Sequence, residues 1–300
     1  MLAQLLRRMI LGQMLMGAAI GYWLATSQGW SLWTCLVVAI GLPFVTLTVV
    51  DIVSALLSMA PAEPAAMWWR SLFGEFRAGM RIFLFWQPWT RTQPALREAT
   101  SGSAKVPVVL VHGYLCNHRI WDNVADTLRA NGHAVFAVNL EPVFASIDSY
   151  TPIVEAAVQS LLQHTGQTKV ALVGHSMGGL AIRAWMRANG TDKVARVLTL
   201  GTPHAGTKLA RGSSTPNGMQ MLWQSPWLAA LTAGESAATR ALIRIAITPQ
   251  DNIVCPQRPQ ILPGIAPVVF EGIGHLQMCT HPPLIQWVAQ ELGALAHAGT

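Results

Sequence analysis

The chain has 300 residues, of which 52% are hydrophobic and only 11% are charged, and its formal net charge at pH 7 is +6. Soluble domains contain roughly 25% charged residues, so the composition favours a globular domain with an apolar appendage over one uniform domain. Residues 9–50 carry no charged side chain. The basic residues form no dense run, which argues against nucleic-acid binding and favours contact with a membrane surface.

Two apolar segments open the chain, at residues 9–25 and 34–59. A bilayer core requires about twenty apolar residues in a helix, so residues 1–60 are predicted to form two transmembrane helices. The alternative is a cleaved signal peptide with Arg7-Arg8 as its basic region, but the apolar length and the second run argue against it. Membrane lipids are therefore expected partners.

The positions of the basic residues predict how this hairpin is oriented in the membrane. They lie before the first span and beyond the second, and the link between the spans has none. Because basic flanks stay on the cytoplasmic side, we expect both ends, and the catalytic domain, in the cytoplasm, at the inner membrane if the source is bacterial. The residues concerned are Arg7, Arg8, Arg70, Arg77 and Arg81.

Residues 61–104 are predicted to form a juxtamembrane segment. Within it, residues 65–86 make an amphipathic helix whose arginines share one face and whose aromatic side chains crowd the rest. Such a helix either lies among lipid headgroups or packs on the globular domain, and the sequence does not decide between them. Residues 87–104, with prolines and small polar residues, indicate a linker.

From residue 105 to residue 300 the pattern alternates between strands and helices. The strands are almost entirely aliphatic, as in parallel sheets covered on both faces. A helix at 152–163 is expected to have Thr151 as its cap and Gly166 after its end. The sequence predicts an α/β fold with a mainly parallel sheet of about six strands, at 106–111, 133–138, 169–173, 195–200, 242–247 and 267–270.

The strongest chemical signal is Val-Gly-His-Ser-Met-Gly-Gly at 173–179, where Gly174, Ser176 and Gly178 fill the pattern G-x-S-x-G. A serine on a tight strand-to-helix turn has strained backbone angles, and glycines on either side relieve the collisions. The segment follows a short buried strand and precedes a helix at 177–188. Ser176 is therefore the predicted nucleophile.

A nucleophilic serine needs a base and an orienting carboxylate. Asp251 follows the strand at 242–247, and catalytic groups in such sheets gather beyond the carboxyl ends of strands. His275 follows the last strand, after Gly272 and Gly274, whose freedom lets the loop bring the imidazole toward Ser176, so it is the predicted base. The weaker alternatives are Glu271 and Asp192 as the acid, and His281 and His204 as the base.

Acyl transfer also requires donors for an oxyanion. The N–H of Met177 at a helix N-terminus is one expected donor, and the N–H of Tyr114, beside Gly113, is the second. His112 is expected to support this loop rather than act as the base.

Together, Val-Leu-Val-His-Gly-Tyr at 109–114, the Ser176 segment, Leu-Gly-Thr-Pro-His-Ala-Gly-Thr at 200–207, Asp251 and His275 resemble α/β-hydrolase lipases and esterases. In particular they resemble bacterial triacylglycerol lipases, over about residues 105–295. The resemblance implies the α/β-hydrolase fold, an ester or lipid substrate, the triad Ser176, Asp251 and His275, and no cofactor. Some such lipases carry a calcium site, but the sequence shows no convincing acidic cluster for calcium, so no metal is expected. Hydrolysis of carboxylic esters is the predicted activity; acyl transfer to another alcohol and a non-catalytic membrane scaffold are the alternatives.

Two further features stay open from the sequence. Residues 206–240 form an apolar insertion that is either a lid or ordinary helix packing. Cys255 and Cys279 follow Asp251 and His275 by four residues each. The two sulfurs are either neighbours, echoing a disulfide of some such lipases, or separate buried thiols; a cytoplasmic location argues against the disulfide. Oligomeric state and acyl-chain length cannot be inferred.

Overall fold

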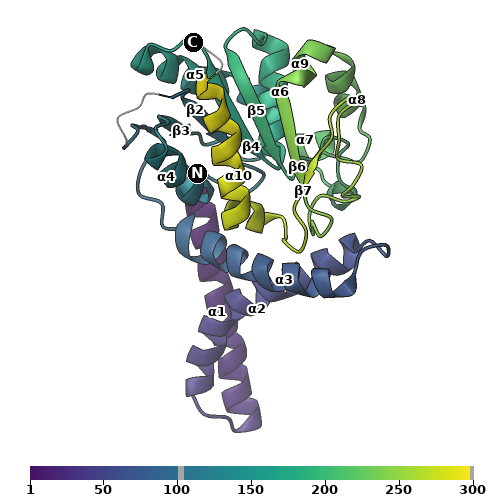
Figure 1. Cartoon of the computed structure of the whole chain (residues 1–300). Coiled ribbons are helices and arrows are strands. Elements are labelled where there is room, and N and C mark those ends of the chain that lie inside the picture. The colour runs from purple at the N-terminus through teal and green to yellow at the C-terminus, as the bar shows by residue number, and fades with distance from the viewer. Residues whose placement is uncertain (101–104, 298–300) are drawn as a thin grey trace.

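A long helical hairpin projects from the globular body in the computed structural model, which describes residues 1–100 and 105–297 (Figure 1). Its helices, α1 (Leu2–Gln28) and α2 (Trp33–Ser58), lie side by side and are long and apolar enough to cross a membrane. The chain turns between them at Gly29, which has a left-handed φ of 66°. Most apolar side chains of the hairpin are exposed, so its outer surface is not covered by the rest of the described chain.

Glycines bring the two helices of the hairpin into backbone contact. A Cβ at Gly17 would lie 2.6 Å from the carbonyl oxygen of Val38, and one at Gly21 would lie 2.5 Å from Cα of Cys35. Small residues four positions apart allow this close packing between membrane helices, where dispersion contacts replace the hydrophobic effect. The hairpin is therefore a packed unit rather than two independent spans.

Helix α3 (Ala65–Gly79) runs crosswise between the hairpin and the globular body, and a π-helical segment, Met80–Trp86, continues it (Figure 1). Trp68, Ser71, Glu75 and Ala78 are buried, whereas Trp69 and Phe73 are exposed. One face of the amphipathic helix is thus packed on protein, and its aromatic face is left free.

The globular body is built on a seven-stranded sheet in the order β1-β3-β2-β4-β5-β6-β7. All neighbouring strands are parallel except β1, which pairs antiparallel with β3. The predicted fold class is confirmed, with one strand more than expected. The strands are β1 (Leu96–Arg97), β2 (Val108–Val111), β3 (Val135–Ala137), β4 (Val170–His175), β5 (Val194–Leu200), β6 (Ile243–Ile247) and β7 (Val268–Val269).

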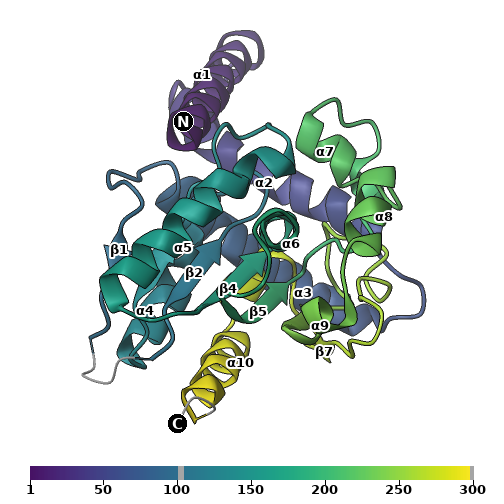
Figure 2. The same cartoon turned by 90° about the horizontal axis from the view of Figure 1, so that it is seen from above.

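Helices cover both faces of this sheet (Figure 2). Alternate residues of β2 point to opposite sides, so Val109 and Val111 join one core while Val108 and Leu110 join the other. The first core includes α5 (Thr151–Thr165) and α6 (Met177–Asn189), and the second includes α4 (Asp122–Ala130) and α10 (Pro282–Gly293). Burial on both sides explains why the strands are nearly all aliphatic.

Two local expectations are wrong. The predicted linker at 87–104 contains β1 and the buried Gln87, whose side-chain oxygen accepts a hydrogen bond from the N–H of Asn117. Thr151 is the first residue of α5 and caps nothing, because the preceding Ile147–Tyr150 turn leads directly into the helix. Gly166 ends α5 in the left-handed conformation, as predicted.

Leucine at position 17 is expected to separate α1 from α2, because a larger side chain has no room beside Val38. Overpacking of this kind costs about 1–3 kcal/mol. Thermal unfolding of detergent-solubilised Gly17→Leu should therefore begin at a lower temperature than that of the unmodified protein. Gly12→Leu is the matched control, since a Cβ at Gly12 meets nothing within 4 Å. Equal effects of both variants would contradict the packing argument.

Candidate active site

Ser176 occupies the sharp turn between β4 and α6, with φ 55° and ψ −129°. A non-glycine residue with positive φ is strained and persists only where its surroundings enforce it. Here the enforcement is close packing. A Cβ at Gly178 would lie 2.0 Å from the carbonyl oxygen of Val111, and one at Gly174 would lie 2.5 Å from the Gly179 nitrogen. Only glycines fit at these two positions, as the G-x-S-x-G pattern requires.

The loop after β2 lies directly against the serine. A Cβ at Gly113 would be 2.7 Å from Cβ of Ser176 and 3.2 Å from its Oγ. The absence of a side chain at Gly113 therefore lets this loop approach the hydroxyl, and this close approach is the reason for expecting an oxyanion donor there.

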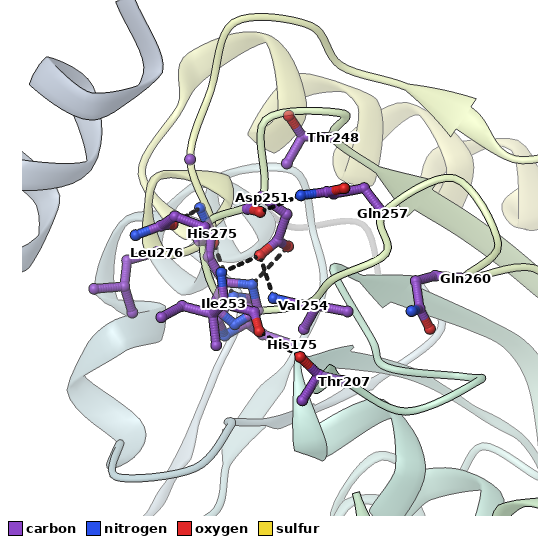
Figure 3. A network of polar contacts seen from close by, with 12 residues as sticks. His175, Thr207, Thr248, Asp251, Ile253, Val254, Gln257, Gln260, His275 and Leu276 are labelled. Atoms are coloured by element: carbon purple, nitrogen blue, oxygen red, sulfur yellow. Dashed lines mark hydrogen bonds and ion pairs between the residues drawn. The ribbon is translucent and has the colours of Figure 1, made fainter. Parts of the chain in front are cut away.

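Asp251 and His275 are in direct contact at the same edge of the sheet. Nδ1 of His275 lies 2.7 Å from Oδ2 of Asp251, and both side chains are almost completely buried. The other carboxylate oxygen, Oδ1, accepts hydrogen bonds from the N–H groups of Ile253 and Val254 at 2.9 and 2.7 Å (Figure 3). The carboxylate is thus fixed by two amides and presents its remaining oxygen to the imidazole.

Neighbouring side chains fix the backbone around this pair. Gln257 Nε2 donates to the carbonyl oxygen of Asp251 at 2.8 Å, and the N–H of His275 donates to Oδ1 of Asn252 at 3.3 Å. His175 Nε2 lies 3.0 Å from the carbonyl oxygen of His275, and the two rings are 4.6 Å apart (Figure 3). This last contact joins the residue before Ser176 to the histidine. The sequence did not point to Asn252 or Gln257, although both stand within six residues of Asp251.

The charges around His275 make its imidazole a better proton acceptor. Burial alone would lower the pKa of its imidazole, but the charge and hydrogen bond of Asp251, together with the charge of Glu75, raise the pKa above 6.5. Because Nδ1 faces Asp251, Nε2 is the nitrogen left for a substrate or a hydroxyl. Within the described residues Ser176 Oγ makes no hydrogen bond to this ring; such contacts are often long without substrate and tighten when it binds.

Two backbone N–H groups remain available beside the serine. In the described part of the chain, the amides of Tyr114 and Met177 donate to no protein acceptor. His112 holds the Tyr114 loop: its Nδ1 donates to the carbonyl oxygen of Gly113 and its Nε2 accepts from the N–H of Leu140. Burial lowers the pKa of His112 to about 4. This histidine is therefore neutral and structural, in line with the sequence expectation.

The alternative acids and bases lie elsewhere. Glu271 and Asp192 are exposed, and neither forms an ion pair with His275. His281 is the residue before α10. His204 is buried between Thr199 Oγ1 and Arg183, at 3.0 and 3.3 Å, and so has both ring nitrogens occupied.

The insertion at 206–240 contains three short helices, α7 (Pro216–Gln220), α8 (Pro226–Ala233) and α9 (Ala237–Ala241). A buried ion pair ties it to α6: Arg183 donates to both carboxylate oxygens of Glu235, at 2.6 and 3.0 Å. Asn217 also donates to the carbonyl oxygen of Val143. These contacts are those of packed helices, and they tie the insertion to the helix that begins after Ser176.

All four cysteines are free thiols. The disulfide left open for Cys255 and Cys279 is therefore not formed, and both side chains are buried.

Comparisons with known proteins agree with this fold. A family model described as alpha/beta hydrolase fold matches residues 106–226. The triacylglycerol lipase of Burkholderia plantarii is 36% identical over 125 residues, which cover 39% of this chain and 34% of that protein. The triacylglycerol lipase of Pseudarthrobacter phenanthrenivorans is 37% identical over 120 residues, 37% of each chain. The chain thus matches only about a third of the length of these relatives.

Solved structures extend the likeness over more of the chain. The mature lipase BlEst2 of Bacillus licheniformis superposes with a TM-score of 0.56 at 19% identity, covering 67% of this chain and 97% of that one. Aspergillus fumigatus lipase B gives the same TM-score at 18% identity and covers 66% and 56%. At these identities the likeness establishes the α/β-hydrolase fold.

Glu235→Gln is expected to destabilise the protein strongly, since it leaves the guanidinium of Arg183 buried without a counter-charge. Breaking such a pair costs about 3–5 kcal/mol. Chemical denaturation should show this as a lower midpoint. The matched control is Asp126→Asn, which removes the exposed partner of Arg97 and should cost less than about 1 kcal/mol. A small effect of Glu235→Gln would mean that the pair does not hold the insertion.

Proposed function

We propose that this chain is a membrane-anchored serine hydrolase that cleaves carboxylic esters through Ser176, His275 and Asp251. The observation that carries the proposal is the buried 2.7 Å contact between His275 and Asp251, beside a serine held at φ 55°. Serine, imidazole and carboxylate in this chain order are typical of α/β-hydrolases. Similarity to triacylglycerol lipases supports an ester as the substrate.

In the proposed mechanism Ser176 Oγ attacks the ester carbonyl carbon while Nε2 of His275 takes its proton. Asp251 stabilises the imidazolium, and the N–H groups of Tyr114 and Met177 donate to the oxyanion. The tetrahedral intermediate expels the alcohol, which receives the proton from His275, and an acyl-serine remains. His275 then deprotonates water, which attacks the acyl-serine. The carboxylic acid leaves and Ser176 regains its proton.

Ser176→Ala should abolish labelling by a fluorophosphonate probe and lower the hydrolysis of simple esters by about 10⁶-fold, because both require the same hydroxyl. The measurements are gel fluorescence of the labelled protein and kcat with a water-soluble ester. Ser149→Ala is the control, since Ser149 is exposed on the same domain and should label normally. Labelling that persists in Ser176→Ala would refute the assignment. Added alcohol acceptors show whether acyl transfer competes with hydrolysis.

We further propose that α1 and α2 anchor the enzyme in a bilayer, with its catalytic domain on the cytoplasmic side. The support is the length and apolar surface of both helices, and the placement of the arginines. The exposed Trp69 and Phe73 on α3, beside Arg70 and Arg77, suit the headgroup region below the domain. A substrate reaching this site is then a lipid or another acyl ester at the membrane surface.

Cysteine labelling in intact cells tests this topology. A membrane-impermeant maleimide should label Ser31→Cys at the tip of the hairpin but not Ser149→Cys on the domain, in a chain whose Cys35 is replaced by serine. The remaining cysteines are buried. Permeabilised cells provide the control, because both positions should then react. Equal labelling of both positions in intact cells would contradict a spanning hairpin, and the reverse pattern would place the domain outside.

A further inference from the structure

The crosswise helix α3 places one carboxylate inside the globular body. Glu75 is only 1% exposed, and its Oε1 and Oε2 accept hydrogen bonds from the backbone N–H groups of Leu276 and Gln277, at 2.8 and 3.0 Å. These are the two residues that follow His275. A helix more than two hundred positions earlier in the sequence therefore holds the turn that carries the candidate base.

Helix α3 packs closely against the residues before and after His275. A Cβ at Gly274 would lie 2.5 Å from Oε2 of Glu75, so glycine is required there for the carboxylate to enter. A Cβ at Gly74 would collide with the side chain of Gln277. Close packing and two hydrogen bonds to successive amides leave the turn at 274–277 little freedom to move relative to α3.

The second observation is that Glu75 has no cation to offset its charge. In the described part of the chain it forms no ion pair with Lys, Arg or the N-terminus. Burial raises the pKa of Glu75 to about 7, although the nearby His275 and the two amide hydrogen bonds act in the opposite direction. A glutamine has a single acceptor oxygen and could accept only one of these two hydrogen bonds, so a carboxyl group is needed to accept from both N–H groups.

The charged and titratable groups around the pair come from several elements. Asp251 faces His275 from the loop after β6, and His175 faces it from the end of β4. Asp51 on α2 and the buried thiols Cys116 and Cys279 lie near Glu75. None of these neighbours of Glu75 is a cation other than the imidazolium of His275 itself. When Glu75 is ionised, its charge therefore acts chiefly on that ring.

We propose that Glu75 is a positioning residue of the active site, which fixes the His275 turn through its two hydrogen bonds and stabilises the imidazolium through its charge. The proposal rests on the proposed role of His275 as the general base. It makes α3 part of the catalytic centre. Helix α2 also supports the loops of this region. Asn252 accepts a hydrogen bond from the N–H of His275, and its own amide group donates to Oγ of Ser54 on α2 at 3.0 Å.

The test compares Glu75→Gln and Glu75→Asp in the full chain in detergent micelles, with a water-soluble ester across the pH range. Glutamine removes the charge and keeps one of the two acceptor oxygens, so His275 should lose its proton more easily. The acidic limb of kcat/KM should then shift to lower pH, because activity requires the neutral imidazole. Aspartate keeps the charge but is shorter, so the limb should stay near its original pH while kcat falls about tenfold or more.

Glu63→Gln is the matched control, since Glu63 precedes α3 and pairs with Arg258 away from His275; its pH profile should equal that of the unmodified enzyme. A Glu75→Gln enzyme with an unshifted limb would overturn the electrostatic role, and a Glu75→Asp enzyme with unchanged kcat would overturn the positioning role. If Glu75→Gln does not fold, Glu75→Asp alone decides. Failure of the proposed function is recognised separately, by an unmodified chain that neither hydrolyses esters nor labels at Ser176.

Discussion

The site depends on the close approach of two backbone segments, the turn at Ser176 and the loop after β2. Gly178 lies so near the carbonyl oxygen of Val111 that any side chain would push α6 away from the sheet. Such a shift would separate the hydroxyl from the loop amides at Tyr114. It would also move Arg183 on α6, and with it the insertion that Glu235 secures. Contacts of backbone with backbone thus set the geometry, and side chains then add the chemistry.

A second layer of constraint comes from the N-terminal helices. The loops that carry Asp251 and His275 are held by side chains of the domain on one side and by α2 and α3 on the other. The side-chain amide of Gln257 donates hydrogen bonds to two carbonyl oxygens, that of Ser58 on α2 and that of Asp251. Loops are ordinarily the least stable parts of a fold. Here their order depends on helices outside the α/β-hydrolase core, so the N-terminal helices and the site form one structural unit.

Local sequence patterns predicted much of this structure, and long-range contacts account for what they missed. Aliphatic runs gave six strands, and the position of Asp251 and His275 after strands brought them to one edge of the sheet. The two-residue strand β1 left no periodic signal, because it exists through pairing with β3. No local pattern singled out Glu75, since its partners are more than two hundred residues away. Only the tertiary structure shows that it is buried.

The turn of the hairpin bears on how the proposed anchor would enter a membrane. Both helices join the globular body at the same end (Figure 1), so in the proposed arrangement only the short segment around Gly29 would reach the opposite face of the bilayer. That segment carries no charge, and Trp30 and Trp33 in it are exposed. Indole rings prefer the boundary between lipid and water. During biosynthesis the insertion machinery would therefore have no charged residue to translocate in this segment, and the tryptophans would retain the tip once it had crossed.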